Sequence, residues 1–262
     1  MNTPQAVSPP SRPASGSQPL PVGREGDGLS EAVARDGFAF LPASRALPMF
    51  RVPGHGGWGA FADSWNRLEL DGHMADGGRY RRRRHATFSI VAPQASVSRE
   101  PHQPHYQDLA YNPLNGGIAR NFAPVEPVVA QGSVFPGLLA AFSDVIASLD
   151  AALEPWQVEV HQFRTEVCAG AEAPPTPEGI HRDGVDYAFM LMVGRRNIER
   201  GQTGIYSLQG RKLAEFRLEQ PGDLAVVDDR RVLHGVTPIR VVAGDAPGTR
   251  DVLVVTFRRK AA

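Results

Sequence analysis

The sequence predicts a mainly β protein with flanking helices, built as an antiparallel sandwich, jelly roll or barrel. Seven short runs rich in β-branched and aromatic residues follow Pro155 and are separated by Gly, Pro and Asp. No helix of ordinary length fits between these runs, which argues against a parallel sheet with crossover helices. Before Pro155 the clearest apolar pattern has helical spacing instead.

The N-terminal stretch differs in composition from the rest of the chain. Ten of the first 22 residues are Pro or Ser. Such a segment cannot bury enough apolar surface to offset the entropy lost on ordering. We therefore predict a disordered tail at residues 1–26 and a single jelly-roll domain at residues 27–262, with a helical N-terminal part.

Three helices are predicted before Pro155. Residues 29–42 suggest a short helix running into a strand, and residues 58–70 suggest a helix that ends at the Asp71-Gly72 turn signal. Residues 136–155 form the clearest helix, since Pro136 suits a first turn and Pro155 follows the end. Its apolar positions recur at helical spacing, which predicts a helix packed against a sheet: Leu138, Leu139, Phe142, Ile146, Leu149 and Leu153.

The strands are predicted at residues 156–167, 186–194, 203–210, 212–219, 223–229, 234–242 and 251–257. Seven consecutive apolar or aromatic residues, 187–193, indicate a strand that is buried on both faces. The arginine-rich residues 79–85 also suit a strand, with Arg79, Arg81 and Arg83 on one face.

Charge and cysteine content exclude several classes of protein. The 28 basic residues balance 28 acidic ones, so neither nucleic acid nor a membrane surface is expected as a partner. No apolar run approaches the ~20 residues that a membrane span requires, and no signal-peptide core is evident. The single Cys168 forbids an internal disulfide, fits a cytoplasmic location and is expected to be buried. The oligomeric state cannot be read from the sequence.

His181 and Asp183 lie just before the driest predicted strand. On an extended backbone two residues apart, both side chains point the same way. His234, which follows a turn, an apolar strand and a second turn, is the candidate third ligand. Two imidazoles and one carboxylate form the facial triad of non-haem Fe(II) oxygenases. His-x-Asp is expected about 0.5 times by chance in a chain of this composition, so a strand-entry turn with a solvated Asp is the alternative.

Arg250 begins an apolar strand, where a buried cation needs a partner. A guanidinium binds a carboxylate through two parallel hydrogen bonds, as the distal carboxylate of 2-oxoglutarate would require. The alternative is a salt bridge to Asp251. Thr237 could add a hydroxyl to the same pocket, although an ordinary strand threonine is an equal explanation.

If the substrate is a free amino acid, as the family resemblance described below implies, its carboxylate and ammonium groups need an arginine and an acceptor. Arg83 is one candidate, and a solvated or acid-paired edge strand is its alternative. Arg164 shares the parity of Trp156, Val158 and Val160, so it enters the cavity if that parity faces the sandwich interior. A β-bulge would reverse this expectation.

The polar and aromatic loop at residues 100–117 is typical of segments that carry recognition. Tyr106, Tyr111 and Asn112 are its candidate substrate contacts, with loop packing as the alternative for each. A second metal at His102 and His105 is disfavoured, because two prolines break helical spacing and no nearby Cys or carboxylate completes a site.

Six stretches together resemble the bacterial 2-oxoglutarate/Fe(II) dioxygenases that hydroxylate free L-amino acids, the group of L-isoleucine 4-hydroxylase. They are "HMADGGRYRRRRHATFSI", "PHQPHYQDLAYNPLNGGIAR", "HQFR", "GIHRDGVDYAFMLMVGRRNIERGQTGIY", "PGDLAVVDDRRVLHGVTPI" and "RDVLVVTF". The resemblance implies a double-stranded β-helix, or cupin-like jelly roll. It also implies iron held by His181, Asp183 and His234, 2-oxoglutarate bound by Arg250, and O2 consumed. Wider relatives carry a serine two residues after that arginine, where this chain has Val252.

The resemblance implies hydroxylation, or sulfoxidation, of a free aliphatic L-amino acid such as isoleucine, leucine or methionine, with release of succinate and CO2. A polar, basic or carrier-bound amino acid is the alternative substrate, and extra acids in the pocket would favour a polar or basic one. Two rivals come from other classes: a non-catalytic cupin-like metal-binding protein, and an interaction protein built around residues 79–84.

Overall fold

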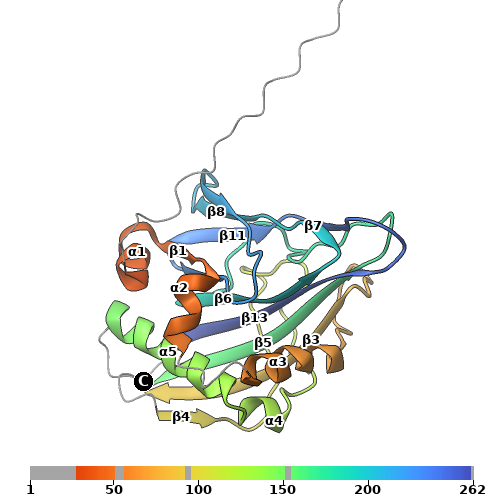
Figure 1. Ribbon diagram of the computed structural model, residues 1–262. Helices are drawn as coiled ribbons and strands as arrows, with labels where there is room; N and C mark the ends of the chain where they lie inside the picture. Colours follow the sequence, from red (N-terminus) through yellow and green to blue (C-terminus); the bar gives the residue numbers. More distant parts are fainter. Residues whose placement is uncertain (1–27, 51–55, 92–95, 151–154, 261–262) are drawn as a thin grey trace, which may run out of the picture.

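An eight-stranded sheet crosses the computed structural model, and two smaller sheets lie on one side of it (Figure 1). The structure describes residues 28–50, 56–91, 96–150 and 155–260, so the tail predicted at residues 1–26 lies outside the described part of the chain. Every pairing between its strands is antiparallel. This architecture confirms the predicted antiparallel, jelly-roll class of fold.

The large sheet contains most of the long strands. In spatial order these are β1 Phe38–Leu41, β10 Leu224–Asp228, β6 Tyr187–Arg196, β13 Gly248–Arg259, β5 Trp156–Val167, β3 Arg81–Val91 and β2 Glu69–Leu70, with β4 Ser96–Arg99 paired to β3. The first seven residues of β6 are all buried. The apolar run at residues 187–193 is therefore the dry, doubly covered strand that its composition predicted.

The smaller sheets are formed by β11 Val232–Val236, β8 Thr203–Ser207 and β9 Lys212–Phe216, and by β12 Ile239–Val241 paired with β7 Ile198–Arg200. The predicted single strand at residues 234–242 was wrong. The chain forms β11 and β12 with Thr237 and Pro238 between them, because proline has no N–H to donate to a ladder.

Helices cover the other face of the large sheet (Figure 1). They are α1 Leu29–Asp36, α2 Ala43–Ala46, α3 Gly56–Asp63, α4 Pro127–Ala130 and α5 Val134–Leu149, with short 3-10 segments η1 Leu47–Phe50 and η2 Ser64–Arg67. α5 packs as predicted: Phe142 stacks on Phe189 of β6 with ring centroids 4.4 Å apart. It ends at Leu149, and the predicted apolar position Leu153 lies outside the described residues.

The two faces of the large sheet are both buried but differ in chemistry. On β5, Trp156, Val158 and Val160 are fully buried in the apolar core shared with the helices. Alternate residues of the same strand, Glu159 and His161, line a cavity on the opposite face. The fold therefore places an apolar core on one face of the large sheet and a polar cavity, also called the chamber below, on the other.

Two local predictions need correction. The helix predicted at residues 58–70 ends as α3 at Asp63 and continues as η2, and Glu69 and Leu70 leave it to pair with Arg83 and Arg82 of β3. Cys168, expected to be buried, is exposed in the turn that follows β5. Among the described helices, none has the length and apolarity needed to cross a bilayer.

Candidate active site

The three predicted metal ligands meet beside β11. His181 and His234 form an isolated antiparallel bridge, with each backbone N–H donating to the other carbonyl at 2.9 Å. The Asp183 carboxylate lies between the two rings: Oδ1 is 3.5 Å from His181 Nε2, and Oδ2 is 3.5 Å from His234 Nε2. One ligand atom from each of the three residues lies within 4.8 Å of the others. The fold thus brings together residues separated by 53 positions in the chain.

Hydrogen bonds orient the ligands. His181 Nδ1 lies 3.0 Å from the Gly179 carbonyl, so it donates there and holds the ring with Nε2 facing Asp183. The Asp229 carboxylate accepts the backbone N–H groups of Asp183, Gly184 and Val185 at 2.9, 2.8 and 3.2 Å. Asp229 therefore holds the segment that carries Asp183 in place.

Burial and the contacts among the three side chains shift the pKa of each of them. Burial lowers the pKa of His234 to about 4, with the neighbouring His181 adding to the effect. Burial also opposes the charge on His181, but its hydrogen bond to Asp183 and the charge of that carboxylate raise its pKa to about 9. Although burial favours the neutral acid, the two imidazoles hold the pKa of Asp183 below its usual range. Two imidazole nitrogens and one ionised carboxylate match the donor set of a non-haem iron site.

Arg250 is a buried cation that no acid in the described part of the chain pairs with. It is 7% exposed, its Nε has no hydrogen-bond partner, and no carboxylate within the described ranges lies at ion-pair distance from it. Burial lowers its pKa to about 10, and the nearby Arg195 adds to that effect. The expected alternative partner, Asp251, binds Arg164 instead. The guanidinium is therefore available for a carboxylate from a ligand.

Thr237 does not reinforce this pocket as predicted. It is exposed in the connection between β11 and β12, where its Oγ1 accepts the Gln202 N–H at 2.9 Å. The hydroxyl is thus used to join two loop segments. β11 ends at Val236, and Pro238 separates it from β12.

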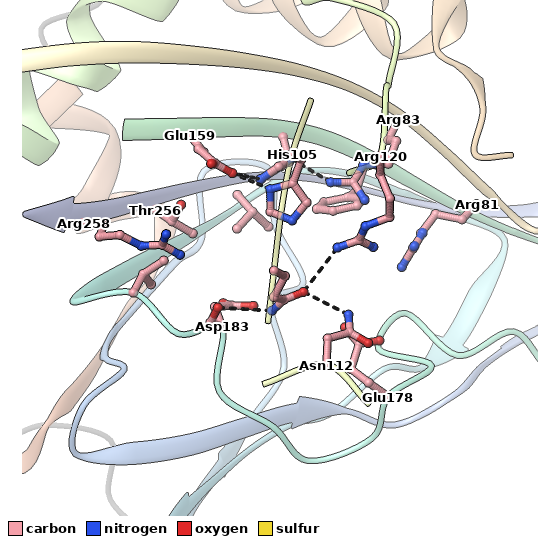
Figure 2. A pocket seen from close by; sticks show the side chains of 15 residues that line it. Arg81, Arg83, His105, Asn112, Arg120, Glu159, Glu178, Asp183, Thr256 and Arg258 are labelled. Atoms are coloured by element: carbon pink, nitrogen blue, oxygen red, sulfur yellow. Dashed lines mark hydrogen bonds and ion pairs between the residues drawn. The ribbon is translucent and has the colours of Figure 1, made fainter. Parts of the chain in front are cut away.

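A cavity opens beside Asp183 and is lined mainly by charged and polar side chains (Figure 2). β3 contributes Arg81 and Arg83, β5 contributes Glu159 and His161, and the polar loop contributes His105 and Asn112. Gln107 of that loop donates its side-chain amide to the Asp183 carbonyl at 3.1 Å. Arg120, Phe163, Glu178, Val185, Val254, Thr256 and Arg258 complete the lining.

The arginines of the cavity retain unused donors. Arg81 binds Asp71 at 2.8 Å, and Arg83 lies 3.7 Å from the same carboxylate. Arg120 is 1% exposed and its closest hydrogen bond, to Gln107 Oε1, is 3.4 Å long. Arg81 Nη2, Arg83 Nε and Arg120 Nε are all buried, and no described residue forms a hydrogen bond with them. Such buried donors are costly unless an anionic ligand accepts from them.

The structure brings some of the predicted substrate residues to the cavity and not others. Arg83 and Asn112 line it. Arg164 does not, and the expectation was wrong because its parity on β5 faces the helices, not the chamber. Its guanidinium makes two 2.7 Å hydrogen bonds to the Asp251 carboxylate.

The two predicted tyrosines also lie outside the cavity lining. Tyr106 is 50% exposed. Tyr111 packs on Gly184, so closely that a Cβ atom there would lie 2.4 Å from its ring, and Gly184 has a φ of +77°. Tyr111 therefore supports the segment that carries Asp183, and a loop-packing role explains it.

Sequence reasoning missed Arg120, Gln107, Glu159, Glu178 and Asp229. Glu159 and His161 alternate with apolar residues in β5, so their polar face was visible. Asp229 belongs to the Asp-Asp pair that ends β10. Arg120 had no local signal, because it lies outside any strand and reaches the cavity only through the path of its loop.

Comparisons with known proteins agree with this geometry. Residues 62–256, more than half of the chain, match the family model described as 2OG-Fe dioxygenase. A bsmA homologue from Methylobium petroleophilum PM1 has a crystal structure that aligns with a TM-score of 0.80 and 32% identity, covering 92% of this chain and 94% of that one.

Two further matches are more distant. The 3(1)-hydroxy-L-isoleucine 4-dioxygenase of Pantoea ananatis (strain AJ13355) is 26% identical over 162 residues, which span 60% of this chain and 64% of that relative. The match therefore covers less than two thirds of that relative. The structure of IDO from Bacillus thuringiensis has a TM-score of 0.73 at 15% identity, covers 89% of this chain and 94% of its own, and supports the fold alone.

Proposed function

The chain belongs to the 2OG-Fe dioxygenase family, and from this premise we propose that it hydroxylates, or sulfoxidises, a free aliphatic L-amino acid such as isoleucine, leucine or methionine. Enzymes of this family use Fe(II), 2-oxoglutarate and O2. Fe(II), when bound, couples the oxidative decarboxylation of 2-oxoglutarate to succinate and CO2 with oxidation of the substrate. The observation that carries the proposal is the His181–Asp183–His234 group beside a cavity whose buried arginines keep donors that no described residue uses.

His181, Asp183 and His234 would hold Fe(II) through His181 Nε2, His234 Nε2 and a carboxylate oxygen. Three protein ligands leave positions for the keto acid and O2 on a metal that prefers six. Asp229 keeps the Asp183 segment fixed through three backbone hydrogen bonds. A rigid ligand set is needed because the metal's reactivity must be directed at one bond of the substrate.

Arg250 would bind the distal carboxylate of 2-oxoglutarate. It is buried, it has an unused donor, and no described acid competes for it. A bidentate guanidinium–carboxylate pair satisfies both charges and fixes the orientation of the cosubstrate. Burial of this pair away from water also strengthens the interaction.

The amino acid would lie beside Asp183 in the cavity. Arg83 and Arg120 supply donors for its carboxylate, and Asn112 lines the same wall. Glu178 is suited to its ammonium group, because Oε2 is buried with no hydrogen-bond partner among the described residues, while Oε1 lies 3.7 Å from His181 Nε2. The aliphatic side chain would contact the apolar parts of the lining: Phe163, Val185 and Val254.

One observation favours a second candidate, the same chemistry on a polar or basic amino acid. Glu159 and Glu178 line the cavity in addition to the candidate metal ligand Asp183. One acid can accept the α-ammonium group, which leaves the other for a polar or cationic side chain. The relative from Pantoea ananatis bears the name of an enzyme whose substrate already carries a hydroxyl group.

The decisive experiment is Fe(II)-dependent succinate release from 2-oxoglutarate across a panel of aliphatic, polar and basic L-amino acids. We expect stimulation by one group of amino acids in the wild type and none in His181→Ala. Stimulation confined to polar or basic amino acids would select the second candidate. Fe(II) binding without any 2-oxoglutarate turnover would instead identify a non-catalytic metal-binding protein.

A further inference from the structure

A second group of metal-ligating side chains lies in the same chamber. In Figure 2, His105 and Glu159 stand on the opposite side of the cavity from Asp183. His85 of β3 and His161 of β5 complete the group, and the register of the two strands pairs them directly. One nitrogen or oxygen from each of the four residues lies within 4.8 Å of the others, the same closeness as in the first triad.

All three imidazoles converge on one carboxylate oxygen. Glu159 Oε2 lies 3.6 Å from His85 Nε2 and 3.5 Å from His161 Nε2, and it also contacts His105 Nδ1. Two adjacent strands provide three of the four side chains, so these positions are rigid. His105 comes from the polar loop, where its backbone is paired with Arg120 in an isolated bridge.

The hydrogen bonds show which of the four side chains can bind a metal and which can only orient another side chain. Arg83 Nη2 lies 2.8 Å from His161 Nδ1, and a guanidinium can only donate. His161 Nδ1 must therefore accept, which leaves the proton on Nε2 facing Glu159. A neutral imidazole in this tautomer has no lone pair for a metal at Nε2. His161 thus serves as a donor that orients Glu159, and the potential ligands are His85, His105 and Glu159.

His85 is the most unusual member of the group. It is 0% exposed, and within the residues that the structure describes neither of its ring nitrogens has a hydrogen-bond partner. A buried imidazole without a partner loses its interactions with water and gains none in return. A metal ion at Nε2 would supply the missing interaction.

The protonation states match those of metal ligands. Burial lowers the pKa of His85 and lowers that of His105 to about 4, although Glu159 acts in the opposite direction on both. The three histidines hold the pKa of Glu159 far below its usual range despite burial. Neutral imidazoles and an ionised carboxylate are the forms that bind divalent cations. Arg83 and Arg120 also lower the pKa of His105, and part of the charge of Arg83 is balanced by Asp71 at 3.7 Å.

We propose that His85, His105 and Glu159 form a second metal site, distinct from the His181–Asp183–His234 triad, for a borderline divalent cation such as Zn²⁺. Imidazole nitrogens and a carboxylate oxygen are the protein ligands of many zinc sites with one open position. The cation joins the polar loop, through His105, to strands β3 and β5. It therefore fastens the loop that carries Gln107 and Asn112 over the cavity.

Co²⁺ titration of the full-length, metal-free chain tests the proposal, because Co²⁺ reports both stoichiometry and coordination number by its visible spectrum. We expect two equivalents per chain in the wild type. His85→Ala and His105→Ala should each bind one, His181→Ala should also bind one, and the His105→Ala/His181→Ala double variant should bind none. His161→Ala should retain two, since His161 is assigned a supporting role.

His85→Ala, His105→Ala and His181→Ala each keep one site, and the equivalent that each retains shows that the protein has folded. A wild type that saturates at one equivalent, lost in His181→Ala, would overturn the proposal and leave the cluster as a hydrogen-bond network. Limited proteolysis of residues 100–117 in His181→Ala gives an independent readout: Zn²⁺ should slow cleavage there and have no effect in the double variant. The succinate assay tests the proposed function separately, so the second metal site and the proposed function can each fail without the other.

Discussion

On the helix-facing side of β5 and β13, Arg164 and Asp251 satisfy each other through two 2.7 Å hydrogen bonds. Arg250 precedes Asp251 on β13 and faces the opposite side of the sheet, where it has no acid among the described residues to bind. Both guanidinium groups are largely removed from water, so the contrast lies in their partners. A buried cation paired within the protein contributes to the fold, whereas one left unpaired indicates a place for an anionic ligand.

The same contrast holds between the two whole faces of the large sheet. The helix-facing side of the large sheet is an apolar core, with aromatic rings packed on one another. The cavity side collects arginines, acids and histidines, several of which have unused donors or acceptors. The helix-facing side stabilises the fold. The cavity side lowers the free energy of unfolding, because it keeps buried polar groups whose donors and acceptors are left for a ligand. Substitutions on the two faces should accordingly change different measurements.

The largest expected effect on the cavity side is at His181. Removing the imidazole in His181→Ala should reduce 2-oxoglutarate turnover by more than about 100-fold, because even residues that only support metal ligands cost 10- to 100-fold when changed. Fe(II)-dependent succinate release measures it. Turnover close to that of the wild type would show that the triad is not the iron site.

Arg250→Lys should raise the KM for 2-oxoglutarate by about 30- to 100-fold, because a lysine cannot reproduce the bidentate pair with a carboxylate. The matched control is Arg164→Lys, an arginine on the same pair of strands but on the helix-facing side. Its KM should stay at the wild-type value. Equal increases in the two variants would contradict the assignment of Arg250 to the cosubstrate.

Arg164→Gln tests the helix-facing pair directly. Removing the guanidinium leaves Asp251 without its main partner in a mostly buried position, and the free energy of unfolding should fall by about 2 kcal/mol. Urea unfolding of the metal-free protein followed by circular dichroism measures this change. A loss below about 0.5 kcal/mol would mean that solvent replaces the pair, as it does for surface salt bridges.

The smallest expected effect concerns the amino acid. Arg120→Lys should raise the KM for the stimulating amino acid by about tenfold, since one charge-assisted hydrogen bond is lost or weakened. The slow release of succinate without amino acid should remain unchanged, because Arg250 and the triad are intact. A parallel loss of that uncoupled turnover would place Arg120 on the cosubstrate instead.

Much of the fold could be predicted from local pattern. The apolar run at residues 187–193, the β5 strand and the packing face of α5 all follow from side-chain periodicity, and the structure confirms them. The closeness of His181 and Asp183 was equally local. The split of residues 234–242 into β11 and β12 was missed, although Pro238 carries the reason for it.

By itself, the sequence determined which residues share a strand face, where the dry strand lies, and which His, Asp and Arg side chains stand at strand ends. Only the tertiary structure decided which face opens onto the chamber. It also selected Asp251 as the partner of Arg164, and brought His105 and Arg120 to the cavity from one loop and Glu178 from another. The physical reason is that alternation along a strand shows which residues share a face, but not which of the two faces packs against the core. When both faces are buried, the elements packed on each decide which becomes core and which becomes site.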